Sequence, residues 1–277
     1  MALEVVAATT VKLTARKIGD EGVQADECFR EELMTVDVNH LLKYGLPSIG
    51  FRSFTVFLYF SNMQIELRQV VPVPLKDKFM QRQSDVWNRN LVFAQGEWAK
   101  IKAPSGTGKT TLVHILYKLR HDYEGLVLWQ NKDLRTIDES ALAQMRQQQV
   151  SIIFQDLRLF PSLTARENIE LKRVLQKPLY ETEVIDAMAE QLGVGHVLNQ
   201  RAGLCSYGEQ QRIAIIRSLV QPFSWLIMDE PFSHLDQVNM RKAADLIAAE
   251  CKKREAGFIL TDLDEDDHFE YARVLNL

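Results

Sequence analysis

The chain has 277 residues, of which 46% are hydrophobic and 25% are charged, and its formal net charge at pH 7 is −4. This composition is typical of a soluble globular protein, and the slightly acidic balance argues against nucleic acid as a partner. The three cysteines lie too far apart for a C-x-x-C motif, a pattern that fits a reducing cytoplasm. No signal peptide opens the sequence, and its most apolar run is too short to span a bilayer.

Residues 1–62 stand apart from the rest of the chain. They carry scattered apolar residues and mixed charges, and no catalytic or binding motif can be recognised among them. Two interpretations stay open: residues 1–62 form an accessory arm, or Met63 is the natural start and they are an artefact of gene calling. From Met63 to Val70 apolar and polar residues alternate, which predicts an edge strand.

The next predicted elements are a strand at residues 97–102 and a helix in which apolar residues recur from Leu112 to Leu119. A glycine-rich turn connects them. Lys100 and Lys102 are unexpected in a strand that this order places in the middle of a sheet, and the sequence offers no account of them.

The glycine-rich turn predicts a phosphate-binding loop. Its residues are Ala103, Pro104, Ser105, Gly106, Thr107, Gly108, Lys109, Thr110 and Thr111. Glycines let backbone N–H groups close around phosphate oxygens, and the following helix adds the partial positive charge of its N-terminus. Lys109 supplies a cation for the β- and γ-phosphates, and Thr110 supplies a hydroxyl for Mg²⁺. The strict pattern begins with glycine, where this chain has Ala103. A chance glycine-rich turn is the alternative, which the strand–loop–helix context argues against.

Further along, Leu126–Trp129 predicts a short strand, and residues from about 140 to 205 predict mostly helix, with a capping box at Thr164–Glu167. Two continuous apolar runs, Trp225–Met228 and Phe258–Thr261, predict strands that are buried on both faces of a parallel sheet. Strands that alternate with helices indicate an α/β fold with a parallel core.

Five motifs in order resemble those of ATP-binding cassette (ABC) proteins. After the phosphate loop come a Q-loop with Gln155, a signature at Cys205–Arg212, a Walker B motif at Asp229–Pro231 and a D-loop at Ser233–Asp236. The match runs from Met63 to the C-terminus, and the subgroup it resembles handles lipoprotein release, macrolide efflux and cell division. The resemblance implies an ABC ATPase domain at 63–277. That domain would have a P-loop NTPase core with a mainly parallel sheet, an antiparallel β edge and an inserted helical subdomain at about 140–205.

In this family two cassettes face each other head to tail with two ATP molecules between them. The resemblance therefore implies a second ABC subunit, in a homodimer, and an integral membrane permease that ATP hydrolysis powers. The chain would be cytoplasmic and peripheral on the inner face of the cell membrane.

The resemblance also implies roles for particular residues. Lys109, Gln155 and Glu230 would be catalytic, with Glu230 as the general base. Thr110, Gln155 and Asp229 would serve Mg²⁺, and Asp229 would also belong to the nucleotide site. The signature residues that would contact nucleotide on the second subunit are Ser206, Gly208 and Glu209.

Several positions depart from the family pattern. Tyr207 replaces the first signature glycine, and Cys205 replaces a leucine. The Val70–Pro74 region has no aromatic residue to stack on adenine, and Asp262 occupies the place of the switch histidine. His114, His234 and His268 offer no clear substitute.

These departures leave a rival hypothesis, a degenerate cassette that binds ATP for assembly or regulation with little hydrolysis. The intact Lys109, Gln155, Asp229 and Glu230 favour the ATPase, whereas Asp262 favours attenuation. A third hypothesis, a soluble cassette that acts on ribosomes or DNA, needs tandem cassettes or a long coiled-coil insertion, and the sequence has neither.

Overall fold

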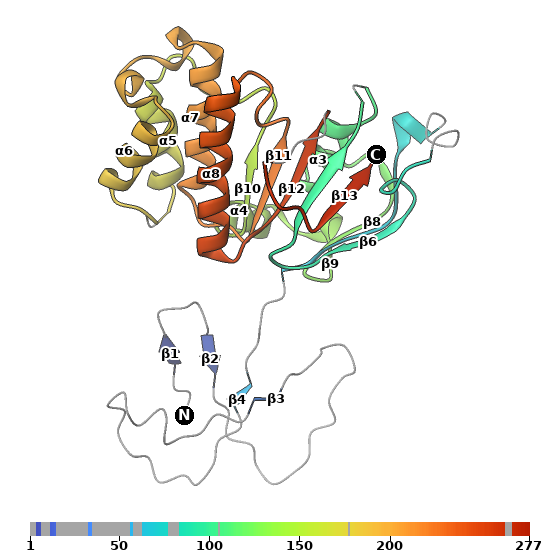
Figure 1. Cartoon of the computed structure of the whole chain (residues 1–277). Coiled ribbons are helices and arrows are strands. Elements are labelled where there is room, and N and C mark those ends of the chain that lie inside the picture. The colour runs from blue at the N-terminus through green and yellow to red at the C-terminus, as the bar shows by residue number, and fades with distance from the viewer. Residues whose placement is uncertain are drawn as a thin grey trace, which may run out of the picture. The chain divides into compact units, whose positions relative to one another are not determined.

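The computed structural model describes residues 4–6, 12–14, 33–34, 56–57, 63–76, 83–104, 106–176, 178–263 and 268–277. The chain divides into two compact units, Met1–Ser61 and Asn62–Leu277. In the first unit β1 (Glu4–Val6) pairs antiparallel with β2 (Lys12–Thr14), and β3 (Leu33–Met34) pairs antiparallel with β4 (Val56–Phe57). The second unit carries every motif described above (Figure 1).

A five-stranded parallel sheet forms the centre of the second unit. Its strands, in spatial order, are β10 (Val150–Ile153), β11 (Trp225–Asp229), β12 (Gly257–Asp262), β7 (Trp98–Lys102) and β13 (Arg273–Asn276). Every residue of β11 is buried, as expected for a strand covered on both faces. The parallel core that the sequence predicts is confirmed, whereas β10 and β13 are strands that it did not predict.

A second, antiparallel sheet has the order β6-β5-β8-β9. Its strands are β5 (Ile65–Pro72), β6 (Asn90–Phe93), β8 (Tyr123–Trp129) and β9 (Lys132–Asp133). The prediction of an edge strand from Met63 was wrong, because β5 lies between β6 and β8. An inner antiparallel strand with one covered face alternates just as an edge strand does.

Six α-helices are described in the second unit. They are α3 (Lys109–Leu116), α4 (Glu139–Gln148), α5 (Ala165–Val174), α6 (Thr182–Gln191), α7 (Tyr207–Leu219) and α8 (Gln237–Arg254). Short 3₁₀ turns lie at Val73–Leu75, Leu134–Thr136, Gly195–Val197 and Ala202–Leu204. The predicted capping box of Thr164 and Glu167 is present at the start of α5.

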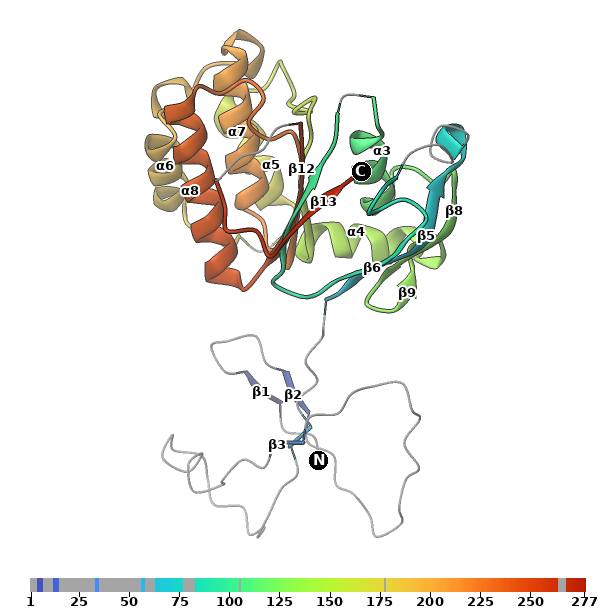
Figure 2. The same cartoon turned by 45° about the vertical axis from the view of Figure 1, so that its right-hand side comes forward.

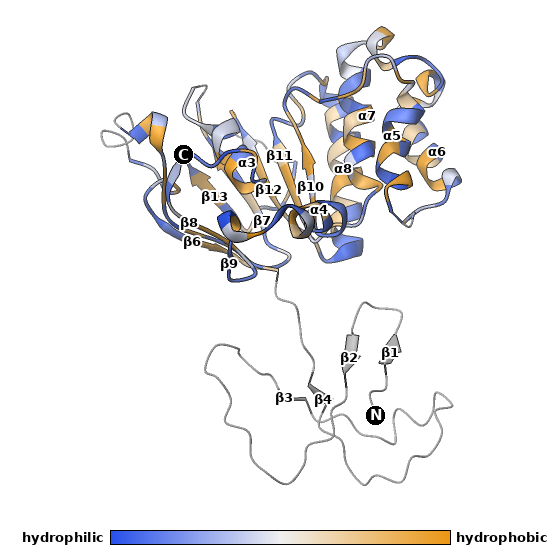
Figure 3. Ribbon diagram, turned by 180° about the vertical axis from the view of Figure 1, so that it is seen from behind, coloured by the Kyte–Doolittle hydropathy of each residue, from blue (hydrophilic) through white to orange (hydrophobic). Residues whose placement is uncertain are grey.

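Two apolar cores hold these layers together. In one core, α5 to α8 pack beside the parallel sheet, and in the other, α3 packs between the parallel and the antiparallel sheet. Figure 2 shows the helices α5 to α8 gathered on one side of the strands, and Figure 3 shows apolar residues concentrated on the parallel sheet. The fold is therefore α/β, with a parallel sheet and an antiparallel sheet, as predicted. Among the described residues, no helix combines the length and the apolar character needed to cross a membrane.

The structure accounts for Lys100, which the sequence left unexplained. Its side chain is buried in β7, and its ammonium group lies 5.6 Å from the centre of the Tyr271 ring. A cation over an aromatic face is electrostatically stabilised. Tyr271 comes just before β13, a strand that the sequence did not predict.

Candidate active site

The predicted residues of the phosphate loop, the Q-loop and the Walker B motif lie at the carboxyl edge of the parallel sheet. The phosphate loop follows β7, Gln155 follows β10, and Asp229 and Asp262 end β11 and β12. Strands that run parallel bring their carboxyl ends to one edge, which is where open α/β sheets bind ligands. Residues far apart in sequence thereby meet in one place.

The phosphate loop is folded around the side chain of Lys109. Gly106 and Gly108 have positive φ angles of 77° and 102°, a region that glycine enters without strain. Lys109 begins α3 and is buried, and its Nζ donates to the carbonyl oxygens of Ala103 at 2.7 Å and Pro104 at 3.3 Å.

Other contacts support this loop. The Thr107 hydroxyl donates to the Pro104 carbonyl at 2.7 Å, and the Ala103 N–H donates to the Asp262 carbonyl at 3.0 Å. Thr110 and Thr111 lie in the first turn of α3. Ser105, also predicted as a phosphate ligand, lies outside the described residues.

Four of the predicted site residues form a connected set of contacts. The Lys109 ammonium lies 3.2 Å from Glu230 Oε1. Gln155 Nε2 donates to Glu230 Oε2 at 3.1 Å, and the Thr110 hydroxyl donates to Gln155 Oε1 at a longer 3.4 Å. Glu230 itself has a φ of 46° and donates its N–H to the Thr261 carbonyl at 2.9 Å. The Glu230 carboxylate therefore lies between the cation of the loop and the Gln155 amide.

Asp229 lies beneath these groups and is buried. The Thr261 hydroxyl donates to its Oδ1 at 2.8 Å. Burial raises the pKa of Asp229, while hydrogen bonds from Thr261 and Thr110 oppose the rise. Because burial disfavours the ionised form of this carboxylate, a cation nearby would stabilise that form.

The oxygen donors at this edge fit Mg²⁺. They are the Thr110 hydroxyl, the Gln155 amide oxygen and the Asp229 carboxylate, all hard oxygen ligands. Mg²⁺ binds through one or two carboxylates and completes its shell with water and substrate phosphates. Nowhere in the described part of the chain do three His, Cys, Asp or Glu side chains gather as a metal cage.

The predicted signature residues lie apart from the phosphate loop of their own chain. Ser206 is the N-cap of α7 and forms a capping box with Glu209. The Glu209 carboxylate accepts from the Ser206 N–H at 2.7 Å and from its hydroxyl at 2.8 Å, which lowers the pKa of Glu209. Within the described residues, no hydrogen bond or ion pair joins Ser206, Gly208 or Glu209 to residues 103–111.

Gln211 is a residue of this site that the sequence interpretation missed. It is buried in α7, and its Nε2 donates to the Pro231 carbonyl at 2.6 Å while its Oε1 accepts from the His234 N–H at 3.0 Å. The amide thereby holds both ends of the turn after Glu230. Its place inside the signature was the available signal, but its partners lie about 20 residues away in the sequence.

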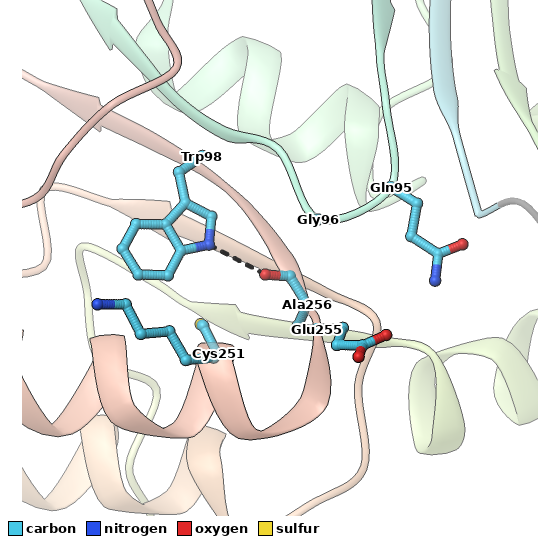
Figure 4. A pocket seen from close by; sticks show the side chains of 7 residues that line it. Gln95, Gly96, Trp98, Cys251, Glu255 and Ala256 are labelled. Atoms are coloured by element: carbon cyan, nitrogen blue, oxygen red, sulfur yellow. Dashed lines mark hydrogen bonds between the residues drawn. The ribbon is translucent and has the colours of Figure 1, made fainter. Parts of the chain in front are cut away.

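A separate recess lies at the opposite edge of the sheet. It has a volume of about 300 Å³ and is lined by Gln95, Gly96, Trp98, Cys251, Lys252, Glu255 and Ala256 (Figure 4). Trp98 begins β7, whereas the phosphate loop follows the end of that strand. Burial raises the pKa of the Cys251 thiol to about 12, so this cysteine is not a nucleophile at neutral pH. The recess is therefore not the candidate site.

Comparisons with known proteins agree with the geometry. The family model described as ABC transporter matches residues 86–233. The lipoprotein-releasing system ATP-binding protein LolD of Legionella pneumophila (strain Lens) is 33% identical over 191 residues, which cover 68% of this chain and 84% of that protein. YvcR of Bacillus subtilis (strain 168), an uncharacterised ABC transporter ATP-binding protein, is 32% identical over 63% of this chain and 68% of its own length.

Solved structures give the same result. The dimeric structure of MJ0796, a bacterial ABC transporter cassette, aligns with a TM-score of 0.60 and 26% identity, over 71% of this chain and 87% of that chain. A dimeric post-hydrolysis state of MJ0796 bound to ADP and Pi aligns with the same TM-score and identity, over 72% and 88%. These relatives do not favour the rival hypothesis of a cassette with little hydrolysis. The family model spans more than half of the chain, and this chain therefore belongs to the ABC transporter ATP-binding proteins and is an ABC-type ATPase.

Proposed function

We propose that residues 63–277 form the ABC ATPase domain, with its helical subdomain at about 140–205, and that the phosphate loop, Gln155 and Glu230 carry out hydrolysis of Mg-ATP. The observation that carries this proposal is the connected set of contacts from Lys109 through Glu230 and Gln155 to Thr110. Side chains from three separate segments meet there around one carboxylate.

The contacts of Lys109 suggest how ATP binding prepares the base. The Lys109 ammonium contacts both the Ala103 carbonyl and Glu230. A γ-phosphate, with more negative charge, competes for that ammonium and releases the Glu230 carboxylate to accept a proton from the attacking water. Gln155, which donates to Glu230, then orients the same carboxylate. Mg²⁺ held by Thr110, Gln155 and Asp229 would neutralise charge on the phosphates.

We propose further that a second copy of the chain completes the site. Ser206 and Gly208 stand at the N-terminus of α7, where backbone N–H groups and the helix dipole favour an anion. The phosphate that they would bind belongs, in this proposal, to a facing subunit. The dimeric cassettes among the structural relatives support this arrangement.

The energy of hydrolysis would serve an integral membrane permease that docks on the segment from Gln155 to Leu163. Phe160 is 56% exposed in this segment, and its backbone is fixed by the buried Asn168, which accepts from the Phe160 N–H at 2.8 Å and donates to its carbonyl at 3.0 Å. Because the Asn168 amide fixes the backbone of Phe160, the exposed aromatic ring is held at the surface, where a partner could contact it. Leu204, also exposed, follows Gly203, where an added Cβ would lie 3.0 Å from the Cβ of Pro161. Such a subunit works in the cytoplasm, on the inner face of the membrane.

The test of docking is a charge placed on the exposed ring. Phe160→Asp should release the full chain from membranes of its host, while its helical content, melting temperature and basal ATPase rate stay within about twofold of wild type. Leu175→Asp is the matched control, because Leu175 is 63% exposed on a segment beyond the end of α5, and it should leave membrane association intact. Retention of the Phe160→Asp variant on membranes, or equal release by both variants, would contradict docking through this segment.

A further inference from the structure

Tyr207 makes contacts that a glycine at its position does not provide. It is the first residue of α7, and its side chain is 45% exposed. The ring lies edge to face with the His234 imidazole, with ring centroids 4.2 Å apart. The phenol hydroxyl points at the Gln155 carbonyl oxygen over a long 3.4 Å. One side chain thus touches both the segment after β10 and the segment after β11.

His234 belongs to the D-loop segment, Ser233–Asp236, which rests on the first turn of α7. The His234 N–H donates to Gln211 at 3.0 Å. A Cβ on Gly208 would lie 3.2 Å from the His234 carbonyl oxygen, so the helix backbone approaches the segment closely there. The Gln211 and Gly208 contacts fix the backbone of His234, and the Tyr207 ring fixes its side chain.

We propose that Tyr207 is a positioning residue that holds the D-loop segment against the amino end of α7, so that both are presented to the second subunit as one surface. The ring contact with His234 contributes most of this positioning, since the hydroxyl contact is at the limit of hydrogen-bond length. The inference rests on the proposed dimer, because both segments gain a function only when a second copy faces them.

The first test needs no dimer. Hydrogen exchange of the nucleotide-free full chain should be about two- to tenfold faster in the peptide spanning residues 231–236 of Tyr207→Ala than in wild type, the range for one aromatic pair. A peptide from the phosphate loop should exchange at the wild-type rate. Tyr207→Phe, which keeps the ring and loses the hydroxyl, should restore wild-type exchange. Unchanged exchange in Tyr207→Ala, or no rescue by Tyr207→Phe, would overturn the proposal.

The second test measures coupling in the dimer. In a Glu230→Gln background with Mg-ATP, Tyr207→Ala and His234→Ala should each weaken dimerisation by about two- to tenfold, and the double variant should be no weaker than the worse single variant. With Glu230 intact, Tyr207→Ala should lower kcat measured at saturating Mg-ATP, because its own phosphate loop still binds nucleotide while the facing surface is less well held. If the losses in dimer affinity of the two single variants add up in the double variant, or if Tyr207→Ala changes only KM, the positioning role is overturned.

The two tests separate the proposals. If the Glu230→Gln protein forms no dimer even with Tyr207 present, the dimer proposal fails, and the role of Tyr207 in presenting a surface to a second subunit falls with it. If that protein dimerises and Tyr207→Ala leaves both exchange and dimer affinity unchanged, the dimer stands and the Tyr207 proposal fails alone.

Discussion

Asp262 ends β12 with its carboxylate bonded to the backbone of the next residue. Its Oδ1 accepts from the Leu263 N–H at 2.6 Å, while its carbonyl oxygen accepts from the Ala103 N–H at 3.0 Å. The contact with the phosphate loop is therefore a backbone contact, which a different side chain at 262 leaves in place. An aspartate carboxylate offers no hydrogen-bond donor to a phosphate, whereas an imidazole does.

We expect Asp262→His to raise the ATPase rate by ~10-fold or more, because a donor aimed at developing oxyanion charge is worth about 10²–10³ in kcat. The measurement is kcat at saturating Mg-ATP. Asp262→Ala is the control, since it removes the charge without adding a donor, and we expect it to gain less than the histidine variant. A wild-type rate of several per second with no gain from histidine would show that another residue supplies the donor.

Lys172 provides a pH-dependent test of the packing around α5. Burial, reinforced by the nearby Arg217 and Arg146, lowers the pKa of Lys172 from 10.5 to about 8. The unfolded chain keeps this proton up to about pH 10.5, so between about pH 8 and 10.5 the unfolded state binds more protons and stability rises with pH. Below pH 8 both states are charged, and the folded state carries the full cost.

Lys172→Met should therefore stabilise the protein at pH 7 by about 1–3 kcal/mol, at about 1.4 kcal/mol per pKa unit with allowance for its partial exposure. The gain should disappear by about pH 10.5. Urea unfolding at pH 7 and at pH 9.5 measures the gain in the free energy of unfolding and its decrease as the pH approaches 10.5. A variant equally stabilised at both pH values would mean that apolar packing, rather than the charge, explains the gain.

Single residues differ in how far the sequence predicts them. The loop residues follow from phosphate-binding chemistry, which needs those residue types at that spacing, whereas the Asp229–Glu230 pair follows from the resemblance to a Walker B motif. Their contacts in the structure, such as Lys109 with Glu230, are consistent with the roles proposed for them. Lys100 was not explicable from sequence, because its partner Tyr271 lies 171 positions away (271 − 100).

At the scale of elements, the sequence predicted a strand correctly where one residue pattern ran through the whole segment. It failed where that pattern was interrupted. The strands β11 and β12 are continuous apolar runs and were predicted. β10 has four buried residues but one of them is Ser151, and it follows a polar helix, so the window was interpreted as helical. β13 is half exposed and includes Arg273 and Asn276, which carry no strand signal.

The connection between α7 and the turn after β11 is an element-scale prediction. Gln211→Ala removes a buried and a partly buried hydrogen bond and leaves the Pro231 carbonyl and the His234 N–H without that partner. We expect a loss of about 1–3 kcal/mol in the free energy of unfolding, together with slower ATP turnover. Gln210→Ala is the control, because Gln210 donates to the Cys205 carbonyl and does not contact the turn. Equal effects of the two variants would show that the turn does not depend on Gln211.

At the scale of the molecule, the two compact units invite a test of residues 1–62. Met63 is built into the second unit: its N–H donates to Gln95 Oε1 at 3.1 Å, and its carbonyl accepts from the Trp225 indole. Every motif lies beyond it in the sequence. We expect a chain that begins at Met63 to bind ATP with the affinity of the full chain, as measured by calorimetry. A tenfold loss would show that residues 1–62 support the nucleotide site.

We propose that this chain hydrolyses ATP between two copies of itself, with Glu230 as the base. Glu230→Gln keeps the size and the Gln155 contact of the side chain but cannot accept a proton, so hydrolysis should stop while the phosphate contacts remain. Sedimentation of this full-length variant with Mg-ATP should show a dimer that dissociates when nucleotide is removed, whereas Lys109→Ala should stay monomeric. A Glu230→Gln protein that remains strictly monomeric with saturating Mg-ATP, or that still hydrolyses ATP at the wild-type rate, would contradict the account.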